Sequence, residues 1–127
     1  MQAVDTNVLV RLLTQDDAAQ FKRATALFER EQVWVAKTVL LETAWVLRSL
    51  YAFEQSRIVA ALRAVAGLEN VLIEDASAVS RAFDLTDAGV DFADALHVIS
   101  MGNAAAFATF DRKFATKAKK LVPVVVL

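Results

Sequence analysis

Five of the fifteen acidic residues stand where an ordinary surface role does not readily account for them. Asp5 and Asp111 each follow a short apolar segment with the composition of a strand. In open parallel sheets, ligands bind beyond the carboxyl ends of the strands. The alternative for both residues is that the carboxylate only caps the helix that follows. The five candidate acids are Asp5, Glu42, Asp91, Asp94 and Asp111.

Glu42 lies in a predicted helix that is apolar over nearly its whole circumference. An ionised carboxylate buried there without a partner would cost several kcal/mol or more. The sequence therefore predicts a cation beside Glu42, either an arginine or a bound metal ion. The alternatives are an internal ion pair or a polar stripe on a solvated helix face.

Asp91 and Asp94 are three residues apart, so they share one face of a predicted helix. Like charges at this spacing repel each other, which is tolerable at a helix N-terminus and useful around a cation. For Asp91 the alternative is N-capping. His97, the only histidine, lies one turn later, and a hydrogen-bonded core residue is the more common reading of such a position.

Clustered carboxylates without cysteine or paired histidines form an oxygen-only site, which suits Mg²⁺ or Mn²⁺ rather than Zn²⁺. Such a site can activate a water molecule and neutralise a phosphate. The chain contains no competing P-loop, glycine-rich dinucleotide turn, HExxH helix or nucleophilic serine elbow. Metal-dependent phosphate chemistry is thus the prediction, provided that the carboxylates converge in space.

Short β-branched apolar runs alternate with segments of helical period, which indicates an α/β fold with a parallel sheet. The remaining acids have local explanations: Asp16, Asp17 and Asp75 as helix caps, and Glu29, Glu31, Glu54, Glu69, Glu74, Asp84 and Asp87 as solvated surface. Gly67 and Gly89 are expected to end helices. Expected strands cover 3–4, 33–36, 71–73, 106–109 and 122–126, and expected helices cover 8–13, 16–30, 38–51, 57–66, 75–88, 91–101 and 111–120.

Composition restricts the class of protein. The chain has 127 residues, of which 57% are hydrophobic and 23% charged, which excludes a disordered chain and predicts one domain over 1–127. The absence of cysteine excludes a disulfide scaffold and a thiolate metal site. No apolar run is long enough to span a membrane, and no signal peptide is evident, so a cytoplasmic location is expected.

Four segments of the chain resemble, in order, the motifs of the PIN-domain ribonucleases, in particular the VapC-type toxins of bacterial toxin–antitoxin pairs. One departure from the family pattern is Lys113, at a place where a second acid is common. The four segments are 4–8 (VDTNV), 38–42 (TVLLE), 91–96 (DFADAL) and 109–114 (TFDRKF).

The resemblance implies a three-layer α/β/α fold with a parallel central sheet, Mg²⁺- or Mn²⁺-dependent cleavage of RNA, and inhibition by a small antitoxin protein. It also implies residue roles. Asp5, Glu42, Asp94 and Asp111 would be the catalytic, metal-binding acids, and Thr6, Asn7, Asp91 and Thr109 would be auxiliary.

Basic and apolar residues suggest further contacts. Arg112 and Lys113, beside a candidate acid, are the better candidates for phosphate contact, whereas Lys117 to Lys120 fit a solvated helix end equally well. Five apolar residues are expected to extend into an interface with a second copy, forming a homodimer, or with an antitoxin. The alternative is a thick monomeric core. These residues are Trp45, Leu47, Leu50, Tyr51 and Phe53.

The main alternative function is a non-catalytic PIN-like module that binds RNA or a partner protein. An aspartyl phosphatase needs Asp-x-Asp after its first strand, and here the second position after Asp5 is Asn7. A phospho-receiver domain needs an acid pair before its first helix, which the chain also lacks. Retention of all four motif acids favours the nuclease.

Overall fold

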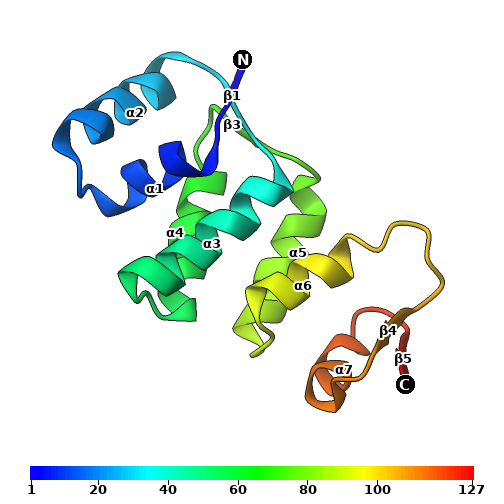
Figure 1. The fold of residues 1–127 in the computed structure, drawn as a ribbon. Helices are drawn as coiled ribbons and strands as arrows, with labels where there is room; N and C mark the ends of the chain where they lie inside the picture. Colours follow the sequence, from blue (N-terminus) through cyan, green and yellow to red (C-terminus); the bar gives the residue numbers. More distant parts are fainter. The chain divides into compact units, whose positions relative to one another are not determined.

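The computed structural model describes all 127 residues, which form two compact units (Figure 1). Unit 1 comprises Met1–Ala76, and unit 2 comprises Ser77–Leu127. Helices alternate with short parallel strands in both units. The predicted α/β class with parallel strands is therefore confirmed, whereas one domain over 1–127 stays a prediction.

Unit 1 contains a three-stranded parallel sheet in the order β1-β2-β3. Its strands are β1 (Gln2–Ala3), β2 (Val33–Val35) and β3 (Val71–Ile73). On the central strand, Val33 and Val35 are fully buried, as β-branched residues on a covered sheet face should be. Because the strands are parallel, β1, β2 and β3 all end at the same edge of this sheet.

Four helices accompany this sheet: α1 (Thr6–Thr14), α2 (Ala18–Arg30), α3 (Lys37–Tyr51) and α4 (Gln55–Ala66). Helix α1 packs against α2 and α3, and α3 packs against α4. The core of unit 1 contains fully buried leucines from three of these helices, namely Leu9, Leu40, Leu47 and Leu62. Gly67 forms the C-cap of α4, as predicted.

Unit 2 consists of α5 (Ala76–Asp87), α6 (Phe92–Ile99), β4 (Phe107–Thr109), α7 (Arg112–Ala118) and β5 (Val124–Val126). Strands β4 and β5 pair in parallel, and α6 packs against α7. The rings of Phe83 and Phe92 stack at 5.6 Å between centroids, which joins α5 to the start of α6. Gly89 follows α5 at a φ of 100°, which explains why the helix ends where predicted.

Three of the local interpretations of acids were wrong. Asp17 alone caps α2, while Asp16 accepts hydrogen bonds from Arg11 and Tyr51. Asp75 pairs with Lys37 at 3.3 Å instead of capping a helix. Glu74, expected on the solvated surface, accepts the backbone N–H of Lys37 at the start of α3. In each case a partner distant in sequence determines what the carboxylate does.

Replacing Asp16 with asparagine should weaken the fold at neutral pH more than at acidic pH. The hydrogen bond from Tyr51 is the main cause that lowers the pKa of Asp16, with smaller contributions from Thr14 and Arg11. A carboxyl whose pKa is lowered by folding stabilises the fold above its unfolded pKa, and this stabilisation is lost as the pH falls through the folded pKa.

Urea unfolding at pH 7 and at about pH 2 tests this expectation. The difference in unfolding free energy between Asp16→Asn and the wild type should shrink at the lower pH. The control is Glu29→Gln, which removes an exposed carboxylate of α2 without an ion pair and should change stability by less than about 0.5 kcal/mol at either pH. A pH-independent difference for Asp16→Asn would contradict the expectation.

Candidate functional site

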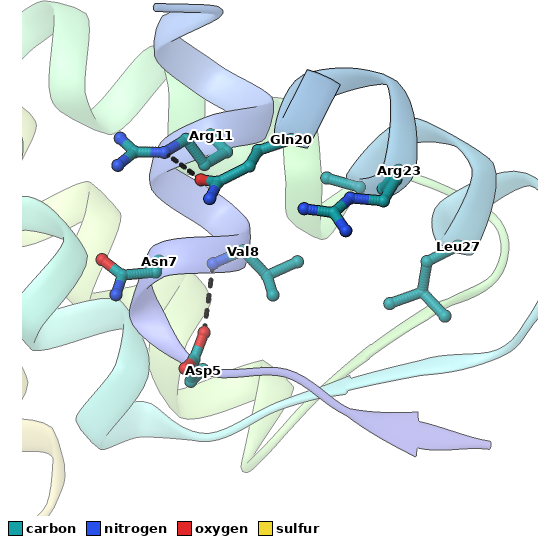
Figure 2. Close-up of a pocket in the computed structure, with 8 residues that line it drawn as sticks. Asp5, Asn7, Val8, Arg11, Gln20, Arg23 and Leu27 are labelled. Atoms are coloured by element: carbon teal, nitrogen blue, oxygen red, sulfur yellow. Dashed lines mark hydrogen bonds between the residues drawn. The ribbon is translucent and has the colours of Figure 1, made fainter. Parts of the chain in front are cut away.

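Asp5 follows β1 and caps α1 (Figure 2). Its Oδ1 accepts the backbone N–H of Val8 at 3.1 Å, so the capping interpretation is confirmed. The side chain is nevertheless exposed, and Oδ2 makes no hydrogen bond. Capping therefore fixes the orientation of the carboxylate at the end of the strand while one oxygen remains available to a ligand.

Glu42 lies on an exposed part of α3, so the expectation that its carboxylate is buried was wrong, whereas a cation beside it stays a prediction. The helix is apolar in composition, but this position is not covered. The buried hydroxyl of Thr6 donates a short hydrogen bond to Oε1 of Glu42. Through this bond the structure brings the first and second motifs together, because Thr6 is the residue directly after Asp5.

A cavity of about 340 Å³ lies between α1 and α2, and we refer to it as the α1–α2 cavity. Asp5, Asn7 and Val8 contribute to its lining, so three residues of the first motif reach it. Figure 2 shows Arg23 and Leu27 projecting from α2 toward α1. The complete lining is Asp5, Asn7, Val8, Arg11, Gln20, Arg23, Ala24 and Leu27.

In unit 2, an aspartate of the third motif and one of the fourth motif each cap a helix, as Asp5 does in unit 1. Asp91 caps α6 by accepting the backbone N–H groups of Ala93 at 3.1 Å and Asp94 at 3.4 Å. Asp111 caps α7 by accepting from Phe114 at 3.0 Å. The backbone N–H of Asp111 in turn donates to Oγ1 of Thr109 at 3.0 Å.

Asp91, Asp94 and Asp111 line one cavity of about 210 Å³, which we call the acidic cavity. Burial raises the pKa of Asp94, and the negative charges of Asp91 and Asp111 raise it further. This mutual repulsion is the electrostatic condition that a bound cation relieves. Besides the three acids, the cavity is lined by Gly89, Val90, Lys113, Phe114 and Lys117.

His97 is exposed, so its interpretation as a core residue was wrong. It lies one turn beyond Asp94 on α6, and its charge lowers the pKa of Asp94. His97 therefore opposes in part the effect of the neighbouring carboxylates. It does not contribute to the lining of the acidic cavity.

The donor chemistry of both units fits Mg²⁺ or Mn²⁺. All four candidate ligands, Asp5, Glu42, Asp94 and Asp111, are carboxylates, and hard divalent cations prefer oxygen. No three histidine, cysteine, aspartate or glutamate side chains lie close enough together to form a metal-binding group. Asp5 and Glu42 lie in unit 1, and Asp94 and Asp111 lie in unit 2.

For Lys117 the sequence left a substrate contact and a solvated helix end open, and the structure shows it half-buried in the lining of the acidic cavity. Its Nζ donates to the backbone carbonyl of Gly89 at 3.2 Å. Gly89 has a φ of 100°, a backbone conformation that L side chains rarely adopt, so a glycine is favoured there. The spacing of Lys113 and Lys117, four residues on one helix, could have indicated that they face the same side.

Arg112 and Lys113, both predicted to contact phosphate, lie at different places. Lys113 lines the acidic cavity, in agreement with a location beside the candidate acids. Arg112 lines a separate cavity of about 390 Å³ together with Lys119 and the end of the chain. The structure therefore brings only Lys113 of this pair to the candidate acids.

The predicted apolar interface needs correction at one residue. Leu47 is fully buried and belongs to the core of unit 1. Tyr51 and Phe53 are half-buried and contact each other edge to face, with Arg57 over the Phe53 ring at 3.7 Å. Trp45 and Leu50 remain exposed, at 63% and 71%.

Comparison with known proteins identifies one family. The model of the PIN domain family matches residues 3–120, a range that spans both units and includes all four motif segments. A search of curated proteins gives no match. No helix of the chain is long and apolar enough to cross a membrane. Because the family model covers nearly the whole sequence, the chain belongs to the PIN domain family.

Proposed function

We propose that this protein is a Mg²⁺- or Mn²⁺-dependent ribonuclease that hydrolyses phosphodiester bonds in RNA. The observation that carries the proposal is the acidic cavity, whose lining includes Asp91, Asp94 and Asp111 together with Lys113 and Lys117. Carboxylates for a cation and ammonium groups for a phosphate are what phosphodiester hydrolysis requires. Membership of the PIN family supports a nuclease-type activity.

Asp5, Glu42, Asp94 and Asp111 are the proposed ligands of the cation. This assignment requires residues 1–127 to act as one domain, and the single family match over both units supports that. A divalent cation in such a site supplies an activated water and neutralises charge on the phosphate. The acids have to be fixed before substrate arrives, because preorganised groups lose little entropy in the reaction.

Residues next to the four proposed ligands hold the carboxylates in position. The Thr6 hydroxyl holds Oε1 of Glu42, and the Val8 amide holds Oδ1 of Asp5. Asp91 and Thr109 hold the backbone beside two of the proposed ligands. Asp91 accepts a hydrogen bond from the backbone N–H of Asp94, and Thr109 accepts one from the backbone N–H of Asp111. Asn7, beside Asp5, is proposed to orient the phosphate. Their proposed role is thus to position acids and substrate.

Lys113 and Lys117 are proposed to contact the phosphate groups of the RNA. Both line the acidic cavity, and Lys117 is held in place by the Gly89 carbonyl. A lysine held near the reacting phosphate compensates the negative charge that develops there. Arg112 is proposed to contact a phosphate further along the strand, because it lines a different cavity.

We further propose that the protein is the toxin of a type II toxin–antitoxin pair, located in the cytoplasm and inhibited by a small antitoxin protein. The four motif segments in VapC-like order support this assignment. Trp45 and Leu50, both on α3, have exposed side chains. These side chains support a protein interface, either with a second copy in a homodimer or with the antitoxin.

Cleavage of end-labelled single-stranded RNA by the purified protein tests the ribonuclease. We expect cutting with Mg²⁺ or Mn²⁺ and none with EDTA. Calorimetric titration with Mn²⁺ on the same preparation accompanies the assay, because a ribonuclease can require one particular RNA. Absence of both cutting and Mn²⁺ binding would overturn the proposal in favour of a non-catalytic PIN-like module.

A further inference from the structure

The α1–α2 cavity has a chemical character of its own. Its floor is apolar and includes Val8, Ala24 and Leu27. One end is formed by Asp5, and the upper part carries two arginines, Arg11 and Arg23 (Figure 2). A pocket with an apolar floor and a few polar groups at its rim is the usual form of a small-ligand site.

The two arginines differ in the hydrogen bonds and ion pairs that they form within the protein. Nε of Arg11 donates to Gln20 at 2.6 Å, and Nη1 forms an ion pair with Asp16 at 3.2 Å. Arg11 is therefore part of the wall that joins α1 to α2. The guanidinium of Arg23 makes no hydrogen bond and no ion pair, although it lines the cavity. Arg23 is exposed, so its guanidinium is accessible, and together with the aliphatic lining it fits a ligand that combines an anionic group with an apolar part.

We infer that the α1–α2 cavity binds one unpaired nucleotide of the RNA substrate, with the base over the floor at Val8 and Leu27 and a phosphate or the base face against Arg23. The inference rests on the proposed function, since Asp5 is then both a metal ligand and the boundary of this cavity. When the scissile phosphate of an RNA strand lies at Asp5, the next nucleotide lies beside Asp5. The α1–α2 cavity begins at Asp5, so it can receive that nucleotide.

An unpaired nucleotide fits this surface better than a duplex does. Sequence-specific RNA recognition relies on splayed-out single-stranded bases that stack on aromatic rings or guanidinium planes. The cavity of about 340 Å³ is at the lower end of ligand-site volumes, which corresponds to one small group. The cavity thus selects for one unpaired position close to the cleavage point.

Two variants test separately how the charge of Arg23 and the shape of the cavity contribute to RNA binding. Arg23→Met removes the positive charge but retains an unbranched apolar stem, and Ala24→Leu fills the floor without changing any charge. The matched control is Lys22→Met, because Lys22 is the exposed neighbour on the same helix and does not line the cavity. Circular dichroism confirms that each variant folds before it is used.

Binding is measured with the full chain in EDTA, by fluorescence anisotropy with a labelled single-stranded RNA of mixed sequence. We expect Arg23→Met and Ala24→Leu to bind roughly tenfold more weakly, as loss of one stacked base predicts, and Lys22→Met to bind within about twofold of the wild type. Photo-crosslinking with 4-thiouridine RNA should modify peptides of α1 and α2. In cleavage assays, the two cavity variants should raise KM and leave kcat unchanged.

The outcomes distinguish this inference from the proposed catalysis. If RNA is cut with Mg²⁺ but both cavity variants bind and crosslink like the wild type, the inference is overturned and the nuclease stands. That result would make a protein segment the better occupant. If no RNA is cut but the cavity variants still lose binding and crosslinks, the nucleotide cavity stands and the catalytic proposal fails.

Discussion

Replacement of Asp94 by asparagine should reduce metal-dependent RNA cleavage by at least about a thousandfold and leave the fold intact. Asp94 lies in the acidic cavity with Asp91 and Asp111. Asparagine has nearly the same shape, but it lacks the charge that attracts a divalent cation. Loss of several kcal/mol of metal-assisted stabilisation, at 1.36 kcal/mol per tenfold change in rate, gives this magnitude.

The same substitution should not weaken the protein. Burial and the charges of Asp91 and Asp111 raise the pKa of Asp94, so folding makes its ionised form less favourable than it is in the unfolded chain. Removing that charge relieves the repulsion, and the asparagine variant should be at least as stable as the wild type at pH 7. Loss of activity through unfolding is thereby distinguished from loss of a metal ligand.

The measurement is single-turnover cleavage of end-labelled RNA together with Mn²⁺ titration and thermal unfolding. Asp84→Asn is the matched control, because Asp84 is an exposed aspartate of α5 that does not line the acidic cavity. Asp94→Asn should lose both cleavage and Mn²⁺ binding, whereas the control should retain both. Cleavage at the wild-type rate by Asp94→Asn would remove Asp94 from the site.

The sequence predicted most successfully those features that depend on a few consecutive residues. Asp91 caps its helix as expected, because a cap needs only the N–H groups two or three residues ahead. Gly67 and Gly89 end α4 and α5 for equally local reasons. The strand over 71–73 was predicted with its observed bounds, since a short apolar run with polar residues on both sides is typical of a strand.

Features that depend on distant partners could not be predicted in this way. Asp16 and Asp17 are equivalent as local cap candidates, and only the presence of Arg11 and Tyr51 assigns Asp16 to a different role. For Glu42, composition indicated an apolar helix but not which side is covered, so an exposed carboxylate was taken for a buried one. For Lys117 the sequence left a solvated helix end and a substrate contact open, because it does not show where the Gly89 carbonyl lies.

Composition also does not show which apolar residues of α3 are buried. The structure does, and it predicts a large loss of stability for one substitution on this helix. Leu47→Ala should lower the free energy of unfolding by about 2–5 kcal/mol, because Leu47 is fully buried and truncation leaves a cavity. Leu40, seven residues earlier, and Ala44, three residues earlier, are buried on the same helix face. The spacing of these residues identifies the face of α3 that packs into unit 1.

Leu50→Ala is the matched control, since Leu50 is 71% exposed and truncation should change stability by less than about 0.5 kcal/mol. Urea unfolding of both variants checks this difference. Equal losses for the two variants would contradict the assignment of Leu47 to the core. If the expected difference is found, a defect in self-association or antitoxin binding can be attributed to Leu50 and Trp45 without a change in stability, whereas the same defect in Leu47→Ala would reflect unfolding of α3.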